Sequence, residues 1–184
     1  MLKKSLKAFF GLLILLIILI TFLLSDFNPI YKNEEFINLT YKIKDAQKED
    51  FKSIIDIHNK IFRKLKEHNC PCQDAVNSIG PAPYRHGYSL TKSLYDQKIK
   101  RNFSQNECLK FVLLHYDFGY RKIGIKDASK FFFNKKIEEL NEKEKLTLIA
   151  MLKNSGLYNP IRNKVGVRNR VLLLERILHS QNKK

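Results

Sequence analysis

Residues 104–177 contain most of the regular helical patterning of the chain: SQNECLKFVLLHYDFGYRKIGIKDASKFFFNKKIEELNEKEKLTLIAMLKNSGLYNPIRNKVGVRNRVLLLERI. Ser104 is followed three residues later by Glu107, just before an apolar run, which is the pattern of a capping box at a helix N-terminus. Phe118-Gly119 is expected to end this helix, because glycine adopts the left-handed conformation of a helix C-cap without steric cost. The tract therefore begins with a long helix.

Further helices are predicted downstream of this one. A short helix is expected over 126–133, and Asn141 with Glu144 forms a second capping pattern. Gly156 and Pro160 stop that helix, and the last one covers about 167–178 with its apolar residues on one face. Strand signals are weak throughout the chain, so the fold class is predicted to be mainly α.

Upstream of the tract, residues 45–68 have the periodicity of an amphipathic helix. Apolar residues recur at steps of three and four, and His58 falls on the same stripe. A single histidine on an apolar face usually belongs to the core, although a ligand or catalytic role is the alternative. Residues 69–84, with three prolines and a glycine, are predicted to be a loop. Residues 85–101 are predicted to be a turn that leads into a helix.

The N-terminus has the pattern of a membrane anchor. Residues 1–7 are basic, residues 8–24 form seventeen consecutive positions without a charge, and residues 25–44 are expected to be a linker or juxtamembrane strand. A cleaved signal peptide is the alternative, but no small-residue cleavage site follows the apolar run. Lysines before the span place the N-terminus in the cytoplasm, so the domain at 45–184 is predicted to be periplasmic or otherwise extracytoplasmic.

The net charge of the chain is strongly positive. The formal value is +16, and +13 remains once Lys3, Lys4 and Lys7 of the first seven residues are set aside. This balance favours anionic partners such as phosphorylated lipids, anionic glycans or nucleic acid, and the charge alone does not choose among them.

The three cysteines, Cys70, Cys72 and Cys108, argue against a fold built on disulfides, because their number is odd. Thiols that stay reduced are the preferred interpretation. A bridge from Cys70 or Cys72 to Cys108 is the alternative for an extracytoplasmic domain. His68 with Cys70 and Cys72 has poor spacing for a zinc site, so no metal site is predicted.

A series of short motifs runs in order through the tract. They are Phe118-Gly119, Gly124-Ile125, Ala128 within a helix, Phe132-Phe133-Asn134-Lys135, Leu140 to Glu144 with Ala150, and Tyr158-Asn159-Pro160. Their order and spacing resemble the C-terminal half of the peptidoglycan glycosyltransferase (transglycosylase) domain of monofunctional transglycosylases and class A penicillin-binding proteins. The resemblance implies a lysozyme-like, mainly α domain behind one transmembrane helix. It also implies peptidoglycan synthesis from a lipid-linked disaccharide precursor.

Upstream motifs of that family are altered here. Residues 87–94 resemble its Gly-Gly-Ser-Thr-Ile-Thr-Gln-Gln-Leu motif, and the basic stretch after them is short and lacks the family's Glu. The resemblance implies that hydroxyl and cationic groups surround the leaving pyrophosphate. The candidates are Ser89, Thr91, Lys92, Lys98, Lys100, Arg101 and either Arg168 or Arg170. A solvated basic surface is the alternative for each cation.

The family's catalytic base lies in a Glu-Asp-x-x-Phe-x-x-His-x-Gly motif, for which Glu49-Asp50 is the candidate. Ile54 then stands at the Phe position, His58 lies two residues late, and no Gly follows. A base of this kind needs a positioned carboxylate with a tuned pKa. The resemblance thus assigns the catalytic role to Glu49. The alternative is that both acids belong to the start of an amphipathic helix.

Three functional hypotheses follow. The protein is a divergent glycosyltransferase, an inactive relative that binds lipid pyrophosphate, glycan or a partner synthase, or an unrelated basic membrane module for anionic lipid or cell-wall polymer. The expected partners are the lipid-linked precursor, the membrane and other cell-wall synthases, and not nucleic acid. The sequence identifies no cofactor, and the resemblance allows a divalent cation on the pyrophosphate.

Overall fold

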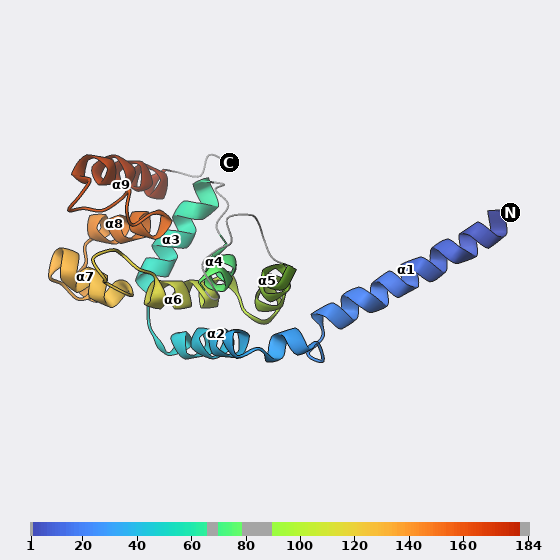
Figure 1. The fold of residues 1–184 in the computed structure, drawn as a ribbon. Coiled ribbons are helices and arrows are strands. Elements are labelled where there is room, and N and C mark those ends of the chain that lie inside the picture. The colour runs from blue at the N-terminus through green and yellow to red at the C-terminus, as the bar shows by residue number, and fades with distance from the viewer. Residues whose placement is uncertain (1, 66–69, 79–89, 181–184) are drawn as a thin grey trace.

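The computed structural model describes residues 2–65, 70–78 and 90–180, and over these the chain is helical (Figure 1). The elements are α1 (Leu2–Leu24), η1 (Pro29–Lys32), α2 (Glu34–Asp45), η2 (Ala46–Lys48), α3 (Lys52–Leu65), α4 (Pro71–Asn77), α5 (Leu90–Asn102), α6 (Gln105–His115), α7 (Ile125–Phe133), η3 (Ile137–Glu139), α8 (Glu142–Lys153) and α9 (Lys164–His179). Within the described ranges the only extended pairing is a single bridge between Asp117 and Ile123. The prediction of a mainly α fold is confirmed.

Helix α6 lies at the centre of the domain and has hydrophobic neighbours on two sides. The predicted capping box starts it, since Glu107 Oε2 accepts from Ser104 N at 2.7 Å and Ser104 Oγ accepts from Glu107 N at 3.3 Å. The apolar side chains of α6 then divide between two clusters of buried residues. Leu109 and Leu113 face one cluster, while Cys108 and Phe111 face the other.

The two clusters occupy opposite halves of the domain. The first joins α3, α7, α8 and α9, and the second joins η1, α2, α4 and α5. Figure 1 shows α7, α8 and α9 gathered at the end far from the N-terminus, with α5 on the side nearest to α1. Helix α6 therefore forms a shared wall between a half that adjoins α1 and a half that lies away from it.

Two segments expected to be irregular are helices. The expectation of a linker or strand over 25–44 is wrong for its second half, where α2 buries Phe36, Leu39 and Ile43 in the second cluster. Asn33 caps α2 by accepting from Glu35 N at 2.9 Å. The predicted loop over 69–84 contains α4, which begins at Pro71; residues 79–84 lie outside the described part of the chain.

Two predicted helix ends also differ from the structure. The amphipathic helix expected from residue 45 begins at Lys52, after α2 has ended and η2 has turned the chain. Helix α6 ends at His115, before Phe118-Gly119. Gly119 does have a positive φ of 88°, but it serves a tight turn in which its carbonyl accepts from Lys122 N at 3.0 Å. The conformation expected of this glycine is correct, and its assignment as a helix cap is wrong.

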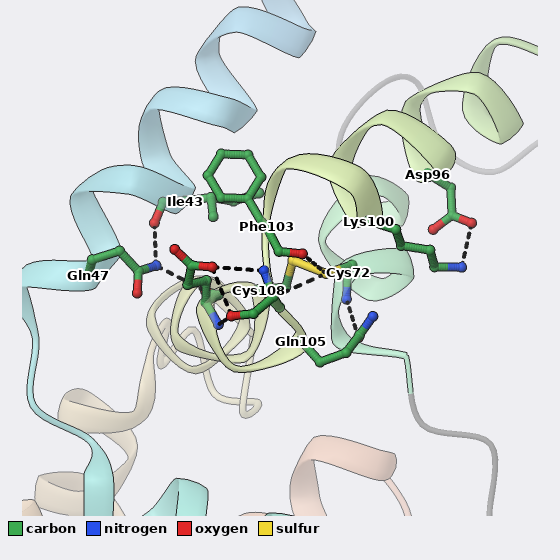
Figure 2. The surroundings of a disulfide bond; sticks show 10 residues. Ile43, Gln47, Cys72, Asp96, Lys100, Phe103, Gln105 and Cys108 are labelled. Atoms are coloured by element: carbon green, nitrogen blue, oxygen red, sulfur yellow. Dashed lines mark hydrogen bonds and ion pairs between the residues drawn. A yellow bond between two sulfur atoms is a disulfide. The ribbon is translucent and has the colours of Figure 1, made fainter. Parts of the chain in front are cut away.

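Helices α4 and α6 are joined by a disulfide between Cys72 and Cys108, shown in Figure 2. Both residues are fully buried, and Gln105 Oε1 accepts from Cys72 N at 3.3 Å beside the bond. The preferred interpretation of three reduced thiols is therefore wrong for two of them. The sequence allowed a disulfide from either Cys70 or Cys72 to Cys108. The structure contains the Cys72–Cys108 bond, and Cys70 is not part of a disulfide.

Helix α1 extends away from the domain (Figure 1), and none of its described side chains belongs to either cluster of buried residues. A segment at Phe9–Lys32 is long and apolar enough to cross a membrane, and none of its apolar window is buried against the protein. In length and composition this helix fits the anchor predicted at 8–24.

The Gly124-Ile125 pair marks a point where the backbone has no room for a side chain. Gly124 has a φ of 84°, and a Cβ atom there would lie 2.6 Å from the carbonyl oxygen of Leu114. Gly124→Ala is expected to lower the free energy of unfolding by about 2 kcal/mol, because left-handed backbone and a backbone clash add together. Urea unfolding of the full chain in detergent measures this effect.

Gly156→Ala is the matched control for this substitution. Its backbone is not in the left-handed region, and its Cβ would meet Asn154 Oδ1 at 3.3 Å, a contact that a shift of a few tenths of an ångström relieves. We expect a change within about 0.5 kcal/mol at this position. Equal losses in the two variants would show that the close approach at Gly124 is not responsible.

Candidate substrate-binding cleft

An open cleft of about 520 Å³ lies between α3, α4, α6 and the C-terminal end of α8. Its lining combines aromatic surfaces with titratable groups that come from four separate stretches of sequence. The groups that bear on function are His58, Phe62, Asp74, His115, Tyr116 and Lys153. Concave sites with a few convergent polar groups are where proteins commonly bind ligands.

His58 lies on the buried stripe of α3, as the sequence predicted, and is only 3% exposed. Its ring packs on Phe62 with 4.4 Å between centroids, and Nδ1 lies 3.3 Å from Asn59 Oδ1. Burial lowers the pKa of His58 to about 4, because a charged imidazole would lose its hydration there. The side chain is therefore neutral at pH 7. The interpretation of His58 as a core residue is confirmed, and because the residue also lines the cleft, a ligand or catalytic role stays a prediction.

His115 reaches the cleft from the last turn of α6. Its Nδ1 lies 2.9 Å from the carbonyl oxygen of Phe111, and its ring stacks on Phe111 with 4.4 Å between centroids. A carbonyl oxygen can only accept, so Nδ1 carries the hydrogen. The ring of His115 is thus held in a fixed orientation at the edge of α6 where it lines the cleft.

Asp74 is the carboxylate among the described lining residues of the cleft, and it lies in the first turn of α4. That helix is short, so its position depends on the disulfide to α6 and on its packing against α5 and α6. The residue is exposed. Sequence reasoning missed Asp74 because residues 69–84 were taken as a loop without a role.

Glu49, the predicted catalytic base, lies outside this cleft. Its Oε2 forms an ion pair of 2.6 Å with Lys126 Nζ in the first turn of α7. The chain just before it is held by Lys110, whose Nζ donates to the Gln47 carbonyl at 3.2 Å. Asp50 instead accepts from Lys52 N at 3.0 Å at the start of α3. For Asp50, the alternative of an acid that serves the start of the helix is what the structure shows.

The predicted substrate-binding residues of α5 are divided among several environments. Lys98 is 5% exposed and pairs with Asp26, Lys100 pairs with Asp96 at 2.6 Å, and Arg101 is exposed. Thr91 and Lys92 lie half-buried in the first turn of α5. Ser89 lies outside the described residues, as do Gly87 and His68.

The two arginines of α9 lie away from α5. Arg168 is exposed, and the guanidinium of Arg170 lies 5.6 Å from the ring centroid of Tyr158. Helix α9 packs on α3 and α8, whereas α5 packs on α1 and α4 (Figure 1). The structure therefore does not bring the predicted cations together at one place. It also brings none of the predicted ligands into the lining described for the cleft.

The motif residues of the C-terminal tract mainly hold its backbone in place. Lys135 Nζ pairs with Glu144 Oε1 at 2.7 Å, and Asn141 Oδ1 accepts from Glu144 N at 2.9 Å. Asn159 is buried, and its Oδ1 accepts from the backbone N–H groups of Ile161 and Arg162 at 3.0 and 3.2 Å. The motifs of the C-terminal tract therefore have structural roles, because their side chains hold the helix ends and turns of this tract in place.

Residues 90–178 match the family model described as transglycosylase. This part of the chain is a transglycosylase-like domain. No curated protein matches the chain. The family match confirms the resemblance to a peptidoglycan glycosyltransferase domain and connects the protein with glycan polymerisation in cell-wall synthesis. It begins at α5, so Glu49, His58 and Asp74 lie before it.

Among the described residues, no group of three His, Cys, Asp or Glu side chains could hold a metal ion. The described lining of the cleft offers two kinds of chemistry. Its aromatic and histidine side chains can pack against and hydrogen-bond a sugar, and Asp74 is a carboxylate of the type that can accept a proton from a hydroxyl.

Proposed function

We propose that this protein is a membrane-anchored relative of the peptidoglycan glycosyltransferases that binds lipid-linked precursor or nascent glycan without polymerising it. The observation that carries the proposal is the position of Glu49. Its carboxylate is paired with Lys126 at 2.6 Å and does not line the cleft. A general base must reach the hydroxyl that it deprotonates, and the position of Glu49 outside the proposed binding cleft supports a role for this residue other than that of the base.

An active glycosyltransferase is the second candidate, and a different observation favours it. Asp74 lines the cleft together with His58, His115 and Lys153. In such an enzyme Asp74 would accept the proton of the acceptor hydroxyl as the new glycosidic bond forms, and lipid pyrophosphate would leave from the donor sugar. An unrelated basic membrane module, the third hypothesis, does not account for the transglycosylase match.

Two features support an anchored domain on the outer side of the membrane. The apolar part of α1 is unburied, and Lys3, Lys4 and Lys7 flank it on the N-terminal side, which favours a cytoplasmic N-terminus. The Cys72–Cys108 bond agrees with this orientation, because disulfides persist in oxidising compartments. The proposed partners are the lipid-linked precursor, the membrane and a partner synthase.

A polymerisation assay separates the two candidates. The full chain in detergent is incubated with lipid-linked disaccharide precursor, and glycan polymer and bound precursor are both measured. We expect the wild-type protein to bind the precursor and to form no glycan polymer. We expect Glu49→Gln to bind the same amount of precursor. Polymer that disappears in Asp74→Asn would establish the enzyme with Asp74 as its base. Polymer that disappears in Glu49→Gln instead would contradict our account of Glu49.

Substitution of Lys153, a lysine in the described lining, tests whether the precursor binds in the cleft. Lys153→Ala is expected to weaken precursor binding about tenfold, because a charge-assisted hydrogen bond to phosphate contributes about 1.5 kcal/mol. Lys145→Ala is the matched control, since this lysine lies on the same helix and does not line the cleft. Equal binding by both variants and the wild-type protein would place the precursor elsewhere.

A further inference from the structure

A second pocket of about 520 Å³ lies where α1 meets the domain. One wall is apolar and comes from the last turns of α1, with Ile20 and Leu24. The other wall is polar and comes from the last turns of α5, with Lys98, Arg101 and Asn102. Phe27, which is 85% exposed, lies at its edge. Among the described lining residues, none is shared with the cleft between α3, α4, α6 and α8.

The junction is held in shape by Lys98. Its Nζ pairs with Asp26 Oδ1 at 2.7 Å, donates to the carbonyl of Leu24 at 3.1 Å, and lies 5.2 Å from the ring centroid of Tyr31. The Leu24 carbonyl belongs to the last turn of α1, where helix carbonyls lack intrahelical partners. A cation at this position satisfies one of them and fixes α5 beside the end of α1.

Because Lys98 is neutralised by Asp26, the positive charge left in the lining is that of Arg101. Lys98 lowers the pKa of the Asp26 carboxyl, and Arg101, which is exposed, lies close enough for its charge to help, so Lys98, Arg101 and Asp26 together leave the lining with one net positive charge. A guanidinium presents a rigid fork of N–H donors that matches the oxygens of a phosphate. One arginine facing an apolar wall therefore suits a ligand that has a phosphodiester at one end and hydrocarbon beside it.

We propose that this junction pocket binds the phosphate group of a membrane phospholipid, with Arg101 on the phosphate and the acyl chains along Ile20 and Leu24. The proposal rests on the membrane anchoring proposed above, because an anchor that ends at Leu24 places the pocket at the depth of the head groups. The bound lipid would cover Phe27 and would set the orientation of the domain relative to its anchor.

The test uses the full chain in neutral detergent with no cell-wall precursor present. Dioleoylphosphatidylglycerol, dioleoylglycerol and inorganic phosphate are added separately, and bound molecules are measured by native mass spectrometry. We expect one phospholipid per chain, and about tenfold weaker binding in Arg101→Gln, which corresponds to the loss of one charge-assisted hydrogen bond. Arg176→Gln is the control, because Arg176 is an exposed arginine on α9. It should bind like the wild-type protein.

Each other outcome overturns the proposal in a recognisable way. Equal binding of dioleoylglycerol would show an apolar groove without a phosphate site, and equal binding of inorganic phosphate would show an anion site without a lipid. Unchanged binding in Arg101→Gln would remove Arg101 as the ligand. Lipid-linked precursor that displaces the phospholipid, and that is weakened by Arg101→Gln but not by Lys153→Ala, would assign the pocket to the precursor. A failure of precursor binding in the cleft leaves the phospholipid result unaffected, so the two proposals fail separately.

Discussion

Replacing Cys72 and Cys108 together by alanine is expected to lower the free energy of unfolding by about 4 kcal/mol. The bond closes a sequence separation of 36 residues, and loop-closure entropy for a loop of that size gives this magnitude. A domain of ordinary stability has only about 5–15 kcal/mol in total, so the variant should lose much of its resistance to urea. Equilibrium unfolding of the full chain in detergent, without reductant, measures the loss.

The third cysteine provides the control for this experiment. Cys70→Ala leaves the bond between α4 and α6 intact and should change stability by no more than about 1 kcal/mol. Wild-type protein treated with reductant should approach the double variant once the disulfide has been cleaved. A loss below about 1 kcal/mol in the double variant would mean that the disulfide does not constrain the unfolded chain.

Lowering the pH from about 7.5 to about 4 is expected to cost the protein about 3 kcal/mol of stability through His58 alone. The pKa of His58 is about 4 in the folded protein and 6.5 in its reference state. Between these values the unfolded chain binds a proton that the folded chain does not, so stability falls as the pH falls. The loss begins near pH 6.5 and is complete below about pH 4.

The His58 contribution is isolated by subtracting a variant that cannot titrate there. Between about pH 7.5 and pH 4, His58→Leu should lose about 3 kcal/mol less unfolding free energy than the wild-type protein. Above about pH 7.5 the unfolding free energies of the two proteins should change with pH in the same way. His115→Gln removes an exposed imidazole from the same cleft and shows how far the loss of another histidine there changes the curve. Parallel curves for wild-type protein and His58→Leu would show that His58 is not buried as described.

The parts of the fold that depend on local chemistry were predictable from the sequence. The capping boxes at Ser104 and Asn141 are satisfied within one helical turn, so they appear in the sequence as short patterns. Helix α2 was missed although Asn33 and the acids after it formed a start signal. Its three buried residues recur at steps of three and four, which is helical periodicity, and contact with α6 stabilises the helix. Helix α4 is short and is secured by a disulfide to a distant residue.

The candidate site was less predictable because distant segments create it. The cleft needs α3, α4, α6 and α8 at once, and no single stretch of sequence contains its pattern. The pairing of Glu49 with Lys126 likewise joins residues far apart in the chain. The basic residues of α5 were identified by type, but Asp26 and Asp96 determine which of them are neutralised. The resemblance to the family therefore predicted the type of domain better than it predicted which residues line the cleft.

The position of α6 between two hydrophobic clusters has a consequence for cooperativity. Its buried residues contribute to both clusters, so neither half of the domain can lose its packing without exposing apolar surface of the other. The half beside α1 contains the junction with the anchor, and the cleft opens across α6 between α4 and α8. The proposed ligand of the cleft and the proposed phospholipid at the junction would thus be linked through one helix, because each would stabilise the folded state on which the other depends.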